Sequence, residues 1–200
     1  MTTTHLVRHG QIKANRVGRW HGSTDSALTW RGRRQAKRTG KYLRGLDVEF
    51  SAAYVSPLQR CQDTAALILA GTDLEAVVVD DLREYGIGEW EDLPFSVLHR
   101  EYDFMRKARE DLSYQPPGGE SIRTVAERMR RAFDAIAANH SEEEHVLVVS
   151  HGACMGVLLA DLIGGDPSGW ADYHLANCSH TRLLLREPAA VDGFNQTTHL

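Results

Sequence analysis

Cysteine is scarce in this chain, and its spacing fits no common metal or disulfide pattern. The three cysteines, Cys61, Cys154 and Cys178, are odd in number and lie far apart in the sequence. A zinc knuckle or a disulfide framework needs cysteines in closely spaced pairs, so the sequence disfavours both. We therefore expect three buried thiols.

Long apolar runs and an excess of basic charge are also absent. No stretch approaches the roughly 20 apolar residues of a membrane span, and the polar opening at 1–5 does not resemble a signal peptide. The formal net charge is −4, which gives no reason to expect nucleic-acid binding. Basic residues do cluster at 31–41, where we interpret them as a solvated helix face. We expect a protein of the cytoplasm, with neither a membrane nor a nucleic acid as partner.

What the chain does have is the composition of one globular domain spanning residues 1–200. Hydrophobic residues make up 42% of the 200 and charged residues 25%. Apolar and β-branched runs alternate with segments of helical periodicity, so strands and helices should alternate along the chain. Such alternation predicts an α/β fold, a three-layer α/β/α sandwich around a mainly parallel sheet.

The predicted elements follow from these runs and from capping and breaking residues. Thr29 and the residues near Ser121 suit helix starts, and a Gln-Pro-Pro-Gly-Gly run at 115–119 interrupts the chain. We predict an ordered loop over 82–93 and a helical insert over about 93–118 that overhangs the crevice. The predicted strands are 4–8, 52–55, 76–79, 146–150, 181–185 and 194–198, and the predicted helices are 29–44, 57–69, 121–139 and 153–163.

Two apolar runs stop at a His-Gly step, and they are the most informative feature. Leu-Val-Arg-His-Gly occupies 6–10, and Val-Val-Ser-His-Gly occupies 148–152. Each reads as a buried strand that ends where the chain must turn. Because ligands bind at the carboxyl ends of strands in open α/β sheets, we expect His9 and His151 to face one site.

Three more residues at predicted loop ends, Arg8, Arg60 and Glu84, complete a set suited to phosphoryl transfer. Two guanidinium groups can bind phosphate, and their charge disfavours the cationic form of a nearby histidine. A neutral imidazole can attack phosphorus, a second can donate to a phosphate oxygen, and a carboxylic acid can protonate the leaving oxygen. No metal is required if the arginines stabilise the charge.

Five motifs in order resemble the histidine phosphatases, the phosphoglycerate-mutase-like superfamily. Arg-His-Gly at 8–10 resembles the signature in which the histidine is phosphorylated, and Leu-Thr at 28–29 resembles a helix start of the family. Ser-Pro-Leu-Gln-Arg at 56–60 is similar to its second arginine motif. Leu-Arg-Glu at 82–84 resembles the proton-donor loop, and Ser-His-Gly at 150–152 the second-histidine motif.

The resemblance implies a role for each matching residue. His9 would be the nucleophile and Glu84 the proton donor, while Arg8, Arg60 and His151 would complete the catalytic set. Substrate-binding residues would be Asn15, His21, Gly22 and Gly152.

Three positions depart from the pattern of the family. Ile12 replaces a common Thr or Ser, Asp92 replaces a common Gly, and His21 stands where Gln is usual. The last of these makes His21 the least secure phosphate ligand of the set.

Simpler interpretations compete at several of these positions. His9 and Arg60, each taken alone, could be structural, and Asn15 could be a helix cap. Glu89, Glu91 and Glu120 compete with Glu84 as the acid. No histidine pair has the i, i+4 spacing of a metal-binding helix face, so we expect neither a metal nor another cofactor.

These expectations combine into a metal-independent phosphomonoesterase that hydrolyses small phosphorylated metabolites and releases inorganic phosphate. A cofactor-dependent phosphoglycerate mutase is the first alternative, and a non-catalytic phosphate-binding module is the second. The sequence does not identify the substrate, and it leaves open whether the insert at 93–118 selects it. A homodimer fits the general prevalence of dimers among soluble proteins.

Overall fold

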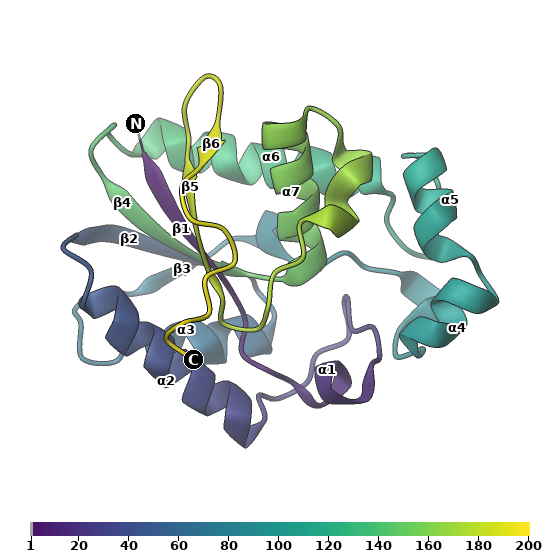
Figure 1. Cartoon of the computed structure of the whole chain (residues 1–200), viewed down its shortest axis with the longest axis horizontal. Helices are drawn as coiled ribbons and strands as arrows, with labels where there is room; N and C mark the ends of the chain where they lie inside the picture. Colours follow the sequence, from purple (N-terminus) through teal and green to yellow (C-terminus); the bar gives the residue numbers. More distant parts are fainter. Residues whose placement is uncertain (1) are drawn as a thin grey trace.

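The computed structural model describes residues 2–200, and its centre is a mixed sheet (Figure 1). Within these residues the sheet has six strands in the order β3-β2-β4-β1-β5-β6. Strands β3, β2, β4 and β1 are parallel to one another, whereas β5 is antiparallel to β1 and β6 is antiparallel to β5. The strands are β1 (Thr3–Arg8), β2 (Phe50–Val55), β3 (Ala76–Val78), β4 (His145–Ser150), β5 (His180–Leu184) and β6 (Ala190–Val191). The predicted mainly parallel sheet is confirmed.

Helices cover both faces of this sheet. In Figure 1, α2 and α3 lie on one side of it and α6 and α7 on the other, while α4 and α5 lie beyond one end. The α-helices are α1 (Lys13–Val17), α2 (Trp30–Arg44), α3 (Gln59–Leu69), α4 (Phe95–Arg100), α5 (Phe104–Glu110), α6 (Ile122–Asn139) and α7 (Gly152–Gly164). Three short 3₁₀ helices are η1 (Asp80–Leu82), η2 (Gly88–Trp90) and η3 (Pro167–Asp172). The α/β/α sandwich is therefore the architecture of the chain.

Side-chain alternation along the central strands explains the three layers. Leu6 and Val148 point to the cluster that includes α6 and α7, whereas Val7 and Val149 belong to the cluster with α2 and α3. All four are fully buried. Successive strand residues face opposite sides of a sheet, so continuous apolar runs need a cover on both faces.

The sequence predicted two helix starts correctly. The hydroxyl of Thr29 accepts a hydrogen bond from the backbone N–H of Gly32 at 3.0 Å, and that of Ser121 accepts one from Thr124 at 3.1 Å. Each side chain satisfies an N–H group that the first helical turn leaves unpaired. The helix starts of α2 and α6 therefore follow from local chemistry.

The predicted strand at 194–198 is wrong. Gly193 and Asn195 adopt left-handed backbone angles, with φ of 90° and 49°, which prevents an extended run. Only Gln196 forms a bridge, to His180, and the last strand is the short β6 at Ala190–Val191. The predicted insert also divides into two short helices, α4 and α5, where the sequence showed only loose helical spacing.

The adjacent strands β1 and β4 end at the same edge of the sheet. Arg8 pairs with Ser150 in register, and the N–H of His9 donates to the carbonyl of Ser150 at 2.9 Å. The two His-Gly steps therefore meet, as the sequence predicted. Across residues 2–200, no helix has the length and apolar character that a membrane crossing requires.

Candidate active site

His9 and His151 lie next to each other where β1 and β4 end. Their ring centroids are 5.2 Å apart, and both side chains are buried. Nδ1 of His9 lies 2.8 Å from the carbonyl oxygen of its neighbour Gly10. A carbonyl can only accept, so Nδ1 carries the proton and Nε2 of the neutral ring keeps a free lone pair.

The surroundings of His9 keep its ring neutral. Burial is the largest cause that holds the pKa of His9 well below its ordinary value, and the positive charges of Arg8 and Arg60 add to it. A cationic imidazole has no lone pair to offer, so these causes favour the form that can act as a nucleophile. The arginine pair thus has an electrostatic effect on His9 as well as the capacity to bind an anion.

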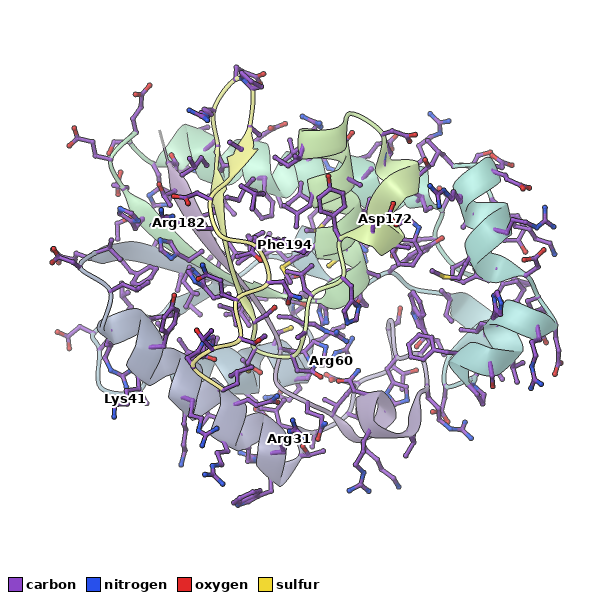
Figure 2. The ribbon with its side chains drawn as sticks, viewed as in Figure 1. Arg31, Lys41, Arg60, Asp172, Arg182 and Phe194 are labelled. Atoms are coloured by element: carbon purple, nitrogen blue, oxygen red, sulfur yellow. The ribbon has the colours of Figure 1, made fainter. Side chains whose placement is uncertain are left out.

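Arg60 is an interior residue, although its position near the start of α3 allowed a surface assignment. Its side chain is 0% exposed, and Figure 2 shows it in the middle of the molecule. Nη1 donates to the carbonyl of Thr24 at 2.8 Å, and Nη2 donates to those of Gly22 and His21 at 2.7 and 3.1 Å. Arg60 therefore also fixes the loop that follows α1.

Nε of Arg60 donates to Nδ1 of His151 at 3.2 Å. Because a guanidinium group has only donors, Nδ1 of His151 must be the unprotonated nitrogen. The proton then resides on Nε2, which lies 2.7 Å from the hydroxyl of Ser56. Burial, followed by the charge of Arg60, lowers the pKa of His151 well below its ordinary value, so this ring is also neutral.

Arg8 is the last residue of β1, directly before His9, and it lines the same pocket as His9. Nη1 donates to the carbonyl of Leu175 at 2.6 Å, and Nε is buried without a hydrogen-bond partner in the described chain. A Cβ at residue 152 would lie 3.1 Å from Cζ of Arg8, so the glycine after His151 gives the guanidinium its space. Gly152 thus has a steric reason to be glycine.

Glu84 reaches the site from the loop after η1. Its side chain is only 7% exposed. Oε1 accepts from the N–H groups of Tyr85 and Cys154, each at 2.9 Å, and Oε2 accepts from that of Ala153 at 3.2 Å. Two of these donors belong to the first turn of α7, so the carboxyl group is held against the helix that begins beside His151.

The other candidate acids are engaged elsewhere. Glu91 accepts from four backbone N–H groups, those of Gly22, Ser23, Thr24 and Ile87. Glu120 pairs with Arg128 at 2.8 Å, and Glu89 is exposed. Of the four candidates, only Glu84 lines the pocket that contains His9.

This pocket has a volume of about 370 Å³ and combines the charged groups with an apolar wall. Helices α4 and α5 of the insert supply apolar side chains, and the segment around η3 supplies further aromatic ones. The volume lies within the usual size range of small-molecule sites. In such sites the apolar lining holds the ligand and a few polar groups fix its orientation. The lining residues are Arg8, His9, Asn15, Arg19, Trp20, His21, Glu84, Phe95, Leu98, His99, Phe104, Met105, Gly152, Ala153, Trp170, Ala171, Tyr173 and His174.

The structure brings most of the expected site residues to this pocket, but not all of them. Arg60, His151 and Gly22 are buried behind it. Gly22 has a structural reason to be glycine, since a Cβ there would lie 2.2 Å from the carbonyl oxygen of Tyr85. The N–H of Gly22 donates to Glu91 and its carbonyl accepts from Arg60, so it connects two loops of the site.

Asn15 and His21 both line the pocket while making hydrogen bonds inside the protein. Oδ1 of Asn15 accepts from the N–H of Ile12 at 3.2 Å and from Nδ2 of Asn177 at 3.1 Å. The helix-cap interpretation of Asn15 is thus compatible with a place in the pocket. Nε2 of His21 lies 2.9 Å from Oδ1 of Asp92, so two departures from the family pattern contact each other. Asp92 also has a left-handed φ of 60°, which explains why glycine suits that position.

Sequence reasoning missed Arg128, which organises the loop that carries Glu84. Its side chain is 1% exposed, and it donates to the carbonyls of Asp81, Arg83 and Glu84 at 2.6–3.0 Å. The available signal was its place on the apolar face of the helix at 122–139, between Val125 and Met129. A buried arginine must have its donors satisfied, and here backbone carbonyls and Glu120 satisfy them.

Comparison with known proteins places this geometry in a family. The family model for the histidine phosphatase superfamily (branch 1) matches residues 4–193. "Probable phosphoglycerate mutase GpmB" of Erwinia tasmaniensis is 35% identical over 185 residues, which cover 92% of this chain and 85% of that protein. "Bifunctional protein Rv2228c" of Mycobacterium tuberculosis is 39% identical over 98% of this chain, which spans only 54% of its length.

A solved structure agrees over the whole chain. The phosphoserine phosphatase of Entamoeba histolytica, crystallised with 3-phosphoglyceric acid, superposes with a TM-score of 0.87 at 27% identity and covers 100% of this chain and 99% of its own. The sequence resemblance is thus confirmed independently by a family model and by the fold. The chain belongs to branch 1 of the histidine phosphatase superfamily and is an enzyme of the histidine phosphatase type.

Proposed function

We propose that the protein is a metal-independent phosphomonoesterase that acts on small phosphorylated metabolites through a phosphohistidine on His9. The observation that carries this proposal is the state of the His9 ring. Its Nδ1 proton is held by Gly10, its Nε2 is free, and two guanidinium groups flank it in the interior. A neutral nitrogen beside fixed positive charge suits attack on a phosphate anion.

In the first transfer, Nε2 of His9 attacks phosphorus while the bond from phosphorus to the leaving oxygen breaks. Arg8 and Asn15, which line the pocket, contact the equatorial oxygens. Arg60 supplies charge from behind, and His151 exchanges its hydrogen bond to Ser56 for one to the phosphate. Glu84 gives its proton to the leaving oxygen; Oε2, with its single contact at 3.2 Å, suits that proton better than Oε1 does.

In the second transfer, water attacks the phosphohistidine and the bond from nitrogen to phosphorus breaks. The ionised Glu84 takes a proton from that water, so the acid of the first step becomes the base of the second. Inorganic phosphate leaves, and His9 returns to its neutral form. The guanidinium groups stabilise the phosphoryl charge throughout, so the scheme uses no metal ion.

A phosphoglycerate mutase is the principal alternative, since two relatives are named probable phosphoglycerate mutases. A mutase returns the phosphoryl group to the same bound molecule and must exclude water while it grips two acidic groups. Two features favour hydrolysis. The Arg83–Glu91 loop resembles that of the phosphatases, and the segment between Glu84 and His151 looks shorter than in the cofactor-dependent mutases. The solved relative with a TM-score of 0.87 is also named a phosphatase.

One assay separates these functions. The enzyme is given 3-phosphoglycerate with a catalytic amount of 2,3-bisphosphoglycerate, and both isomer formation and phosphate release are measured. A second assay uses p-nitrophenyl phosphate in the presence of a chelator. We expect phosphate release to exceed isomer formation, with turnover of the aryl ester unaffected by the chelator. Isomer formation in excess would establish the mutase, and phosphate binding without turnover of any ester would establish a binding module.

The insert at 93–118 is the part of the chain that we propose to select the leaving group. Phe95, Leu98 and Phe104 from this segment contribute to the apolar lining of the pocket. A cytoplasmic location and a homodimer stay predictions.

A further inference from the structure

A second and larger groove adjoins the pocket that contains His9. Its volume is about 870 Å³, and it shares part of its wall with the first pocket, including Arg8, Asn15 and His174. Its far side is formed by helix α2. The two cavities are therefore neighbours, and a leaving group that extends from His9 past these shared side chains would reach the groove.

Three arginines of α2 line the groove in one row. Arg31, Arg34 and Arg38 follow at intervals of three and four residues, which puts them on the same stripe of a helix. Figure 2 labels Arg31 at the end of α2. All three are exposed, and with a rise of about 1.5 Å per residue the row spans roughly 10 Å.

The charge of this row is not compensated within the described chain. Arg31 and Arg38 form neither an ion pair nor a hydrogen bond there, and Arg34 contacts only the ring of Trp30, 5.4 Å from its centroid. No Asp or Glu side chain lines the groove, although the whole chain has a net charge of −4. Arg33, on another face of α2, has Asp63 as a partner at 3.9 Å.

A solvated helix face, which the sequence favoured, accounts for this row less well. An ordinary solvated face faces open water and tends to mix both signs of charge. Here α2 contains no acidic residue, and the row lines a groove that shares lining residues with the catalytic pocket. The side chain of Arg8 lines both the groove and the pocket that contains His9. Its buried Nε has no hydrogen-bond partner in the described chain.

We propose that this groove binds a second phosphate group on the substrate. The substrate is then a small phosphomonoester whose leaving group carries its own phosphate: one phosphate lies at His9, and the other lies on the row formed by Arg31, Arg34 and Arg38. Guanidinium groups bind phosphate through paired N–H donors, which lysine does not offer in the same geometry. This inference rests on the proposed phosphatase function and specifies its substrate class.

The test compares matched substrates and matched variants. Each substrate pair shares its ring system and differs by one phosphate, for example adenosine 3′-phosphate with adenosine 3′,5′-bisphosphate, and fructose 6-phosphate with fructose 1,6-bisphosphate. The double variant Arg34→Gln/Arg38→Gln removes two charges from the groove. The control Arg33→Gln/Lys37→Gln removes two charges from exposed positions of the same helix that do not line it.

We expect at least one bisphosphate to have a kcat/KM about tenfold or more above that of its monophosphate partner. The groove variant should remove this preference through KM, while the control variant keeps it. Both variants should hydrolyse p-nitrophenyl phosphate like the wild type. A wild type that prefers no bisphosphate, or a preference that the groove and control variants lose equally, would overturn the inference.

The failure of this inference differs visibly from the failure of the proposed function. If p-nitrophenyl phosphate releases no phosphate, the phosphatase assignment itself is wrong. If it does release phosphate and no bisphosphate is preferred, only the groove assignment is wrong. An oligonucleotide with a terminal phosphate is included as a further substrate. If its kcat/KM exceeds that of every bisphosphate and depends on the groove arginines, the ligand is a nucleic acid and the small-molecule assignment is overturned.

Discussion

Nε of Arg60 donates a hydrogen bond to Nδ1 of His151 across 3.2 Å in a fully buried part of the protein. This contact determines which nitrogen of His151 carries the proton, because a guanidinium group cannot accept. The proton lies on Nε2, and that is the form of the ring that can donate to a phosphate oxygen. One arginine thus sets the protonation of one histidine and lowers the pKa of both.

Replacing Arg60 should damage activity and stability together. In Arg60→Gln, the carbonyls of Thr24 and Gly22 lose their donors and His151 loses its fixed tautomer. We expect kcat/KM to fall at least about 100-fold and the free energy of unfolding to fall by about 3 kcal/mol. Phosphate-release kinetics and urea unfolding measure the two effects. Arg33→Gln, an exposed arginine of α2, is the control, and a variant of Arg60 that matched it in both measurements would contradict this role.

Glu84→Gln should reveal the proton donor through its dependence on the leaving group. An alkyl phosphate needs a proton on the departing oxygen, so we expect its kcat/KM to fall by about 10² to 10⁴. p-Nitrophenolate leaves readily without a proton, and kcat/KM for its ester should fall much less. Glu89→Gln, at an exposed position of the same loop, should change neither value. Equal losses for both esters in Glu84→Gln would remove Glu84 from the role of acid.

Arg8→Gln should move the acid limb of the pH profile upward. The positive charge of Arg8 is, after burial, the largest cause that lowers the pKa of His9. Without that charge His9 is protonated more easily, so its pKa rises and activity is lost at a higher pH as the solution is acidified. We expect the acid limb of the pH dependence of kcat/KM to shift to higher pH by about half a pH unit or more, measured with the same substrate. Arg16→Gln, exposed and outside the pocket, should leave the limb in place.

A chain of three histidines away from the site should make the fold sensitive to acid. Nδ1 of His5 lies 2.9 Å from Nε2 of His180, and Nε2 of His5 lies 2.9 Å from Nδ1 of His145. Burial is the largest cause that lowers the pKa of His5 to about 3 and that of His180 to about 4. In the unfolded chain these histidines take up protons near pH 6.5, whereas in the folded chain they stay neutral down to a much lower pH. Their contribution to the free energy of unfolding is therefore complete above pH 6.5 and is lost as the pH falls below it.

The variant His5→Gln tests this linkage. Between pH 7 and pH 4.5, the wild type should lose about 2 kcal/mol more unfolding free energy than the variant, which lacks the central titrating group. Urea unfolding at the two pH values measures the difference, and titrating carboxylates contribute equally to both proteins. Parallel losses in the two proteins would show that the histidine chain does not control acid stability.

Local patterns predicted the parts of the fold that depend on neighbouring residues. The strands that end at His9 and His151, and the caps Thr29 and Ser121, follow from apolar runs and capping chemistry. The strand predicted at 194–198 was wrong because left-handed turns at Gly193 and Asn195 are not visible in an alternating pattern.

The candidate site, like the fold, was predicted only in part from the sequence. Sequence motifs identified Arg8, His9, Glu84 and Asn15, which the fold brings to one pocket. They did not show that Arg60 and His151 are fully buried behind it, because the contacts of these two residues join segments that lie 38 to 91 residues apart in the sequence. Arg128 was missed for a similar reason: beside Glu120, its partners are distant backbone carbonyls, which every residue has and which no side-chain pattern reveals.

The central claim is that His9 carries the phosphoryl group, and a rapid-quench experiment tests it most directly. The enzyme is mixed with a substrate labelled in its phosphate, quenched in alkaline denaturant and separated from free label. We predict acid-labile label on the wild-type protein and none on His9→Ala, with the folded state of the variant checked by its unfolding curve. Equal labelling of both proteins would contradict the account.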